Sequence, residues 1–90
     1  MGGGGIFEKE LNKLIESEDN IECIKDIISK DIYNEKQKEN IERLLEFSSE
    51  NQLFRSEAWG YYFLGWYYFD ESNYEQAVDN FMIICQNFRP

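Results

Sequence analysis

The feature that most constrains the fold of this chain is its shortage of residues that break regular structure. The single proline, Pro90, is the last of the 90 residues, and beyond the run 2–5 the glycines are Gly60 and Gly65. Glycine and proline mark turns more strongly than any other residues. So few of them favour long helices with short connections over many strands and turns. A chain of this length forms one small domain with a limited core.

The spacing of the apolar residues predicts five helices. Isoleucines in the second segment would also suit a strand, but their three- and four-residue spacing favours a helix. The segments cover residues 6–16, 21–33, 35–50, 54–69 and 74–88. We therefore expect an all-α domain of four or five helices over residues 6–90, and we interpret residues 1–5 as a flexible leader or a cloning remnant.

Polar residues separate these segments. Asp19 or Asn20 is available to cap the second helix, and Asn34 ends or bends it. In the third helix, Glu39 and Arg43 form an i,i+4 pair. The fifth segment is clearly amphipathic. Its expected apolar face comprises Tyr74, Ala77, Val78, Phe81, Met82, Cys85 and Phe88.

The charge balance limits the classes of partner that this chain can bind. Eighteen acidic residues against 9 basic ones give a net charge of −9. This disfavours binding to nucleic acids and to anionic membranes, both of which need lysine and arginine. A basic protein surface would be attracted, although an acidic domain is more often simply soluble. No apolar stretch approaches the roughly 18 residues of a membrane span, and no signal peptide is recognisable, so we expect a cytoplasmic location.

Residues that carry chemistry are scarce. The chain has no histidine, which removes the commonest general base and metal ligand. Cys23 and Cys85 match no disulfide framework or metal motif, and we expect both on apolar helix faces. The paired carboxylates are better interpreted as solvated helix faces, and no phosphate-binding glycine loop occurs. We expect no catalytic site, no metal and no cofactor.

One segment carries a specific motif. Tetratricopeptide repeats have the pattern W-x2-L-G-x2-Y, then A-x3-F, then proline, in a helix–turn–helix of about 34 residues. Residues 56–90 resemble this family, with Pro90 about one residue late. The matching residues are Tyr61 (in place of Trp), Leu64, Gly65, Tyr68, Tyr74, Ala77 and Phe81. Because glycine inside a helix costs about 1 kcal/mol relative to alanine, Gly65 suggests close approach of the second helix, with Ala77 opposite it and Phe81 filling the gap. Leu64 and Tyr68 are expected to meet Tyr74, Ala77 and Phe81.

The part before this hairpin fits the pattern poorly. A step back of 34 residues places Phe47 under Phe81, but Lys30 and Asp31 under Leu64 and Gly65. Residues 6–53 therefore have two open interpretations. They include one degenerate repeat, or they are unrelated helices that cap the hairpin.

A second aromatic row on the fourth helix lies outside the repeat pattern. Trp59, Tyr62, Trp66 and Phe69 follow i, i+3, i+7, i+10 spacing and therefore share one face. The family resemblance implies that this face, with Asp70 at its end, lines a groove for a partner peptide. Packing on the first three helices and self-association remain alternatives.

A single repeat cannot bury its faces alone. Another copy or a partner would cover its open end. The candidate residues for that contact are Phe63, Tyr67 and Phe88. We expect a protein–protein interaction module that binds another protein or peptide. The alternatives are a homo-oligomerising domain or array fragment, and a small acidic antagonist of a basic protein surface.

Overall fold

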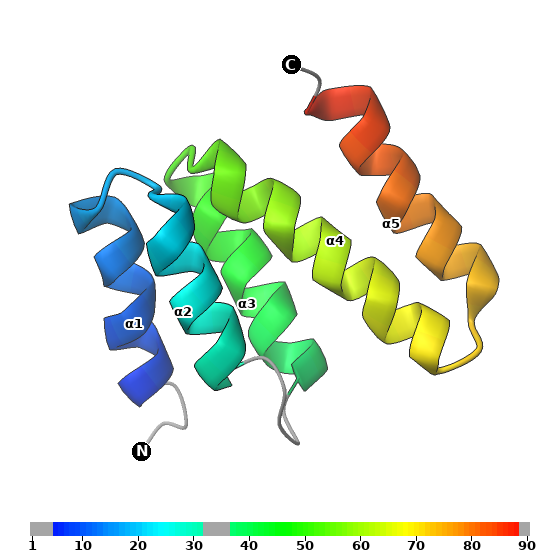
Figure 1. The fold of residues 1–90 in the computed structure, drawn as a ribbon, viewed down its shortest axis with the longest axis horizontal. Helices are drawn as coiled ribbons and strands as arrows, with labels where there is room; N and C mark the ends of the chain where they lie inside the picture. Colours follow the sequence, from blue (N-terminus) through cyan, green and yellow to red (C-terminus); the bar gives the residue numbers. More distant parts are fainter. Residues whose placement is uncertain (1–4, 32–36, 89–90) are drawn as a thin grey trace.

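The computed structural model describes residues 5–31 and 37–88, which form five α-helices and contain no strand (Figure 1). The helices are α1 (Gly5–Glu16), α2 (Ile21–Asp31), α3 (Gln37–Glu50), α4 (Phe54–Asp70) and α5 (Tyr74–Asn87). The predicted all-α class is confirmed. Some predictions concern residues outside these ranges. They are the predictions for the leader at 1–4, for Asn34 and the helix ends at 32–36, and for Pro90.

Consecutive helices run in opposite directions across the molecule (Figure 1). α1 packs on α2 and α3, while α4 packs on α2, closely on α3 and closely on α5. α5 lies at the edge, on the side of α4 away from α1 and α2. α4 therefore joins α5 to the rest of the helices.

The core is built almost wholly by the first four helices. Its buried side chains are Phe7, Leu11, Leu14, Ile24, Ile27, Ile28, Ile41, Leu44, Phe47, Leu53 and Leu64. α5 contributes one buried apolar side chain, Ala77, which lies outside this cluster. Because burial of apolar surface is the main stabilising term in folding, α5, which adds no side chain to this cluster, is held mainly by its packing on α4.

Two adjacent polar residues cap two different helices. The Asn20 side chain accepts a hydrogen bond from the backbone N–H of Glu22 at 2.8 Å, at the start of α2. Asp19 instead reaches α4, where it accepts from the N–H groups of Arg55 (2.7 Å) and Ser56 (3.0 Å) and from the Ser56 hydroxyl. Left-handed backbone at Glu18 and Asp19 (φ 57° and 61°) forms the turn that carries this carboxylate.

This arrangement supplies a cap that α4 lacks locally. Leu53 stands at its N-cap position, and a leucine side chain has no acceptor for the free N–H groups of the first turn. The cap therefore comes from a residue 36 positions earlier than Arg55.

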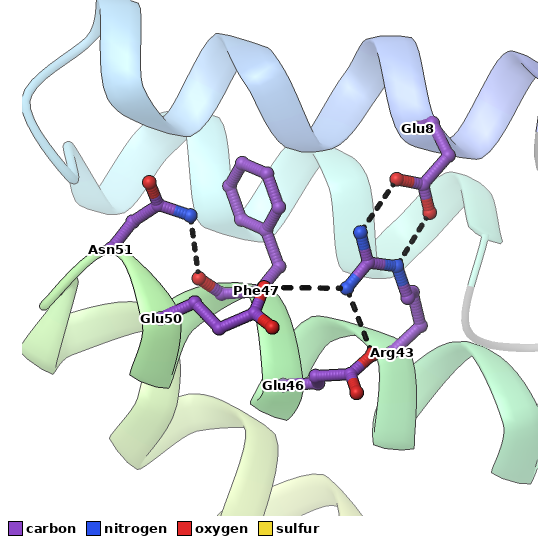
Figure 2. A network of polar contacts seen from close by, with 6 residues as sticks. All are labelled: Glu8, Arg43, Glu46, Phe47, Glu50 and Asn51. Atoms are coloured by element: carbon purple, nitrogen blue, oxygen red, sulfur yellow. Dashed lines mark hydrogen bonds and ion pairs between the residues drawn. The ribbon is translucent and has the colours of Figure 1, made fainter.

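An ion-pair network joins α1 to α3 (Figure 2). Arg43 points from α3 towards α1 and holds both carboxylate oxygens of Glu8, with Nε–Oε2 at 2.7 Å and Nη2–Oε1 at 2.8 Å. It also pairs with Glu46 at 3.0 Å. The sequence pattern suggested Glu39 as the partner of Arg43, and this was wrong, because Glu8 on the packed helix offers a two-point contact.

The inward face of α5 is rotated relative to the prediction. Ala77 is buried and Phe81 is half-buried, as expected. However, Asn80 is buried as well, and the predicted inward residues Tyr74, Val78, Met82 and Cys85 are exposed. The broad apolar stripe of α5 packs closely against one helix, α4, which leaves the other half of the stripe uncovered.

Candidate functional site

The aromatic row of α4 lies at the surface over most of its length. Trp59 is half-buried and packs against the core. Tyr62, Trp66 and Phe69 keep 41%, 42% and 46% of their surface exposed. None of these three side chains belongs to the buried core cluster or packs against it, so their exposed surface is available to a ligand.

Neighbouring rings in the row stand nearly perpendicular to one another. The centroids of Trp59 and Tyr62 are 5.7 Å apart with an angle of 83° between the planes. Those of Tyr62 and Trp66 are 6.3 Å apart at 81°, and those of Trp66 and Phe69 are 5.3 Å apart at 72°. Edge-to-face pairs of this kind are favourable because the positive edge of one ring meets the negative face of the next. The row is thus held in a defined geometry although it is exposed.

Phe81 of α5 fixes one side of the row. Its ring lies 6.2 Å from Tyr62 and 5.7 Å from Trp66, measured between centroids. It fits against Gly65, where an added Cβ would come within 2.5 to 2.8 Å of three ring carbons. The close approach of α5 expected at Gly65 is confirmed, with Phe81 as the side chain that uses the space.

Two hollows flank the row. The first, of about 210 Å³, lies between α4 and α5 and is lined by Ala58, Trp59, Tyr62 and Ile84. The second, of about 530 Å³, is lined by Gln37, Trp59, Tyr62, Phe63, Trp66 and Asp70, and so lies between α3 and α4. Trp59 and Tyr62 border both. We call the two hollows with the rings between them the aromatic groove.

The groove unites four of the five partner-binding candidates. Trp59, Tyr62, Trp66 and Asp70 line it, while Phe69 lies beyond it, with its ring 5.4 Å from that of Tyr74. Sequence reasoning missed Gln37, Ala58 and Ile84. The position of Ile84, three residues after Phe81, could have indicated it, but nothing in the sequence brings Gln37 to α4.

The repeat-signature residues occupy several environments. Leu64 is buried, and Tyr61 is half-buried, with its ring 6.4 Å from that of Phe88. The expected meeting of Tyr68 with α5 was wrong in part. Tyr68 packs on the core with the Lys38 ammonium 5.7 Å from its ring centroid, and Tyr74 meets Phe69 instead.

The candidates for the open end of the repeat are not freely exposed. Phe63 and Tyr67 are half-buried against the core. Phe88 is half-buried beside Tyr61. The larger exposed apolar side chains of α5 are Tyr74, Val78 and Met82.

A carboxylate borders the second hollow, whereas the cation Lys38 lies beside a ring outside its lining. The Asp70 carboxylate is exposed at the rim of the second hollow. Lys38 lies beside Tyr68, and the proximity first of Tyr68 and then of Glu42 raises the pKa of its ammonium group. The lining of the second hollow includes no cationic side chain.

Metal-binding clusters and membrane-spanning helices are absent from the described part of the chain. Residues 5–31 and 37–88 contain no group of three or more acidic or cysteine side chains placed to hold a metal ion. No helix among them has the length and apolar character needed to cross a bilayer. Cys23 is half-buried and Cys85 is exposed, and neither forms a disulfide with another described residue.

Comparison of the chain with protein-family models, with curated protein sequences and with solved structures returned no match.

Proposed function

We propose that this chain is a protein-interaction module that binds a peptide segment of a partner protein in the aromatic groove. The observation that carries the proposal is the exposure of Tyr62 and Trp66, each about two-fifths exposed and neither part of the buried core cluster. Both line the hollow between α3 and α4, and Tyr62 also lines the apolar hollow between α4 and α5. The proposal includes a tetratricopeptide-like hairpin formed by α4 and α5, which the fit of Phe81 against Gly65 supports. It assigns no catalytic role, and it places the protein in the cytoplasm.

Ring chemistry supports this use of the surface. Tryptophan and tyrosine are enriched among the residues that dominate binding energy at interfaces. They provide large contact area with few rotatable bonds, and the edge-to-face contacts within the row restrict the rings before any partner arrives. Less conformational entropy is then lost on binding.

The test is selection from a library of displayed peptides, followed by affinity measurement with variants. Tyr62→Ala and Trp66→Ala are each expected to weaken binding of the selected peptides by about tenfold or more, as for interface residues worth over 1.4 kcal/mol. Tyr74→Ala is the matched control, since Tyr74 is a still more exposed tyrosine (57%) and does not line the groove. Equal effects of all three substitutions, or a library without binders, would refute the proposal.

Self-association through α5 is the second candidate, and a separate observation favours it. Tyr74, Val78 and Met82 recur at intervals of four, and each is about half exposed or more. They form one apolar face of α5 with no covering element among the described residues. Burial of this face against a second copy would remove apolar surface from water.

Light scattering over a range of protein concentrations tests this second candidate. Val78→Glu should abolish any dimer, because it places a charge in the proposed contact. Gln76→Glu adds the same charge at another exposed position of α5 and should leave the mass unchanged. A wild-type chain that stays monomeric at millimolar concentration would exclude the interface.

A further inference from the structure

We infer that the hollow between α3 and α4 receives a cationic side chain, so that the bound segment of the partner carries a lysine or arginine next to an apolar residue. The inference rests on the proposed function and specifies the chemistry of the ligand. It follows from the orientation of the rings, from the charge at the rim, and from the apolar hollow next door.

Two walls of the hollow are ring systems set nearly at right angles. Tyr62 and Trp66 line it with an angle of 81° between their planes and 6.3 Å between their centroids. Both remain more than two-fifths exposed, so ring surface is accessible to a ligand. The face of an aromatic ring carries partial negative charge and attracts an ammonium or guanidinium group within about 6 Å of the centroid. Perpendicular rings let one cation meet two aromatic surfaces.

Asp70 adds a full negative charge at the rim of the same hollow. Its carboxylate forms no ion pair or hydrogen bond with the described residues. Lys38 on α3 lies over the ring of Tyr68, which does not line the hollow. A cation held by the rings would therefore meet an unpaired carboxylate, and such charge complementarity favours a basic partner over an acidic one.

The hollow between α4 and α5 determines which kind of side chain lies next to the cation on the ligand. It is lined by Ala58, Trp59, Tyr62 and Ile84 and presents almost entirely apolar surface. Because Trp59 and Tyr62 border both hollows, side chains that fill them must be close together on the ligand. The matching ligand therefore presents one basic and one apolar residue in proximity.

The charge of the whole chain acts in the same direction. With 18 acidic and 9 basic residues, its field attracts basic segments and repels acidic ones before contact is made. This general attraction extends only over about 10 Å at 0.1 M salt, whereas the hollow distinguishes the position of the charge within the ligand. An experiment must therefore separate the local effect from the general one.

The probe is a positional-scanning library of acetylated, amidated peptides of roughly seven residues, since an extended chain of that length spans about 23 Å. This is close to the rise of about 25 Å along the 17 residues of α4. Lysine or arginine is expected to dominate at one position, with a leucine-like residue preferred next to it or two positions away. Replacing that lysine by norleucine, which keeps the aliphatic chain, should weaken binding by about fivefold or more, in line with partly desolvated cation–π contacts.

Charge-reversed variants then locate the effect. Asp70→Lys should weaken binding of the lysine peptide by about tenfold but leave the norleucine analogue nearly unchanged. Glu71→Lys is the matched control, since it changes the net charge equally at an adjacent exposed residue that does not line the hollow. It should weaken both peptides by less than about twofold at 0.15 M salt.

The outcomes separate the two proposals. If no peptide binds, the proposed function fails and the inference fails with it. If peptides bind through Tyr62 and Trp66 without preferring a cation, only the inference is overturned. It is also overturned if Glu71→Lys acts as strongly as Asp70→Lys, since the general charge would then explain the preference. A selective loss with Asp70→Lys supports it.

Discussion

The backbone at Gly65 lies against the ring of Phe81, and this contact determines how closely α5 approaches α4. Gly65→Ala would gain about 1 kcal/mol in helix propensity, but the added Cβ would overlap a ring that Tyr62 and Trp66 hold from the other side. We expect a net decrease of about 1–2 kcal/mol in the free energy of unfolding, as for other overpacked sites, measurable by urea denaturation.

Gly60 provides the control for this substitution. There an added Cβ would come within 2.7 Å of Leu45 Cδ2 and 2.9 Å of its Cγ, but Leu45 is an aliphatic side chain that is only half-buried and can change rotamer. Gly60→Ala should therefore cost less than Gly65→Ala. The double variant Gly65→Ala/Phe81→Leu should recover part of the loss caused by Gly65→Ala alone. Additive losses would show that the Phe81 ring is not the obstacle.

Asp19 is the second residue that stabilises a part of the fold distant from it in sequence. Asp19→Ala removes the acceptor for two backbone N–H groups of α4 and for the Ser56 hydroxyl. We expect a loss of about 1–2 kcal/mol, the upper part of the range for helix caps. Glu18→Ala in the same turn is the control, and it should change the stability by less than half as much in the same urea titration.

Among the elements, α1 and α3 are joined by a contact that should respond to pH. The hydrogen bonds from Arg43, opposed in part by desolvation, lower the pKa of the Glu8 carboxyl group. A group whose pKa is lower in the folded state stabilises the fold above its ordinary pKa of 4.5 and loses this contribution as the pH falls below that value. Because the pair is partly exposed, solvent screens it, and its contribution at pH 7 is about 0.5–1 kcal/mol.

Glu8→Gln tests this contact. Its loss of stability relative to the wild type should be present at pH 7 and should be smaller at pH 3, below the ordinary carboxyl pKa of 4.5. Lys9→Gln changes an exposed charge on the same helix and serves as the control. A loss for Glu8→Gln that is equal at both pH values would contradict the ion-pair explanation.

Helix positions could be predicted from the sequence more reliably than helix faces. The positions of Leu11, Leu14 and Ile24 determine which face of their helices turns inward, because a small core needs these side chains. On α5 the apolar stripe is wider than the single helix that covers it, so periodicity alone could not decide whether Val78 or Asn80 faces inward. The aromatic row was predictable for the same reason as the core, whereas Gln37 enters the groove only through the packing of α3 on α4.

At the scale of the whole molecule, stability should decrease towards α5. This helix packs closely on α4 and adds only Ala77 to the buried apolar side chains. Amide hydrogen exchange under native conditions should therefore be at least about tenfold faster in the middle of α5 than in α2 and α3, through partial opening. A selected peptide should slow exchange in α5 in particular, because it would contact both walls of the groove. Equal protection in all helices would contradict this gradient.

The cap that Asp19 provides also bears on how this chain can be divided and reused. Helical hairpins are attractive parts for grafting, and residues 54–88 would be the natural piece to transplant. That piece would leave behind the carboxylate bonded to the N–H groups of Arg55 and Ser56, and Leu53 could not replace it. A graft would need Leu53→Asp or Leu53→Ser to begin its first helix properly. For the same reason the cap of α4 requires chain segments distant in sequence to meet, which couples the stability of this helix end to the long-range topology of the fold.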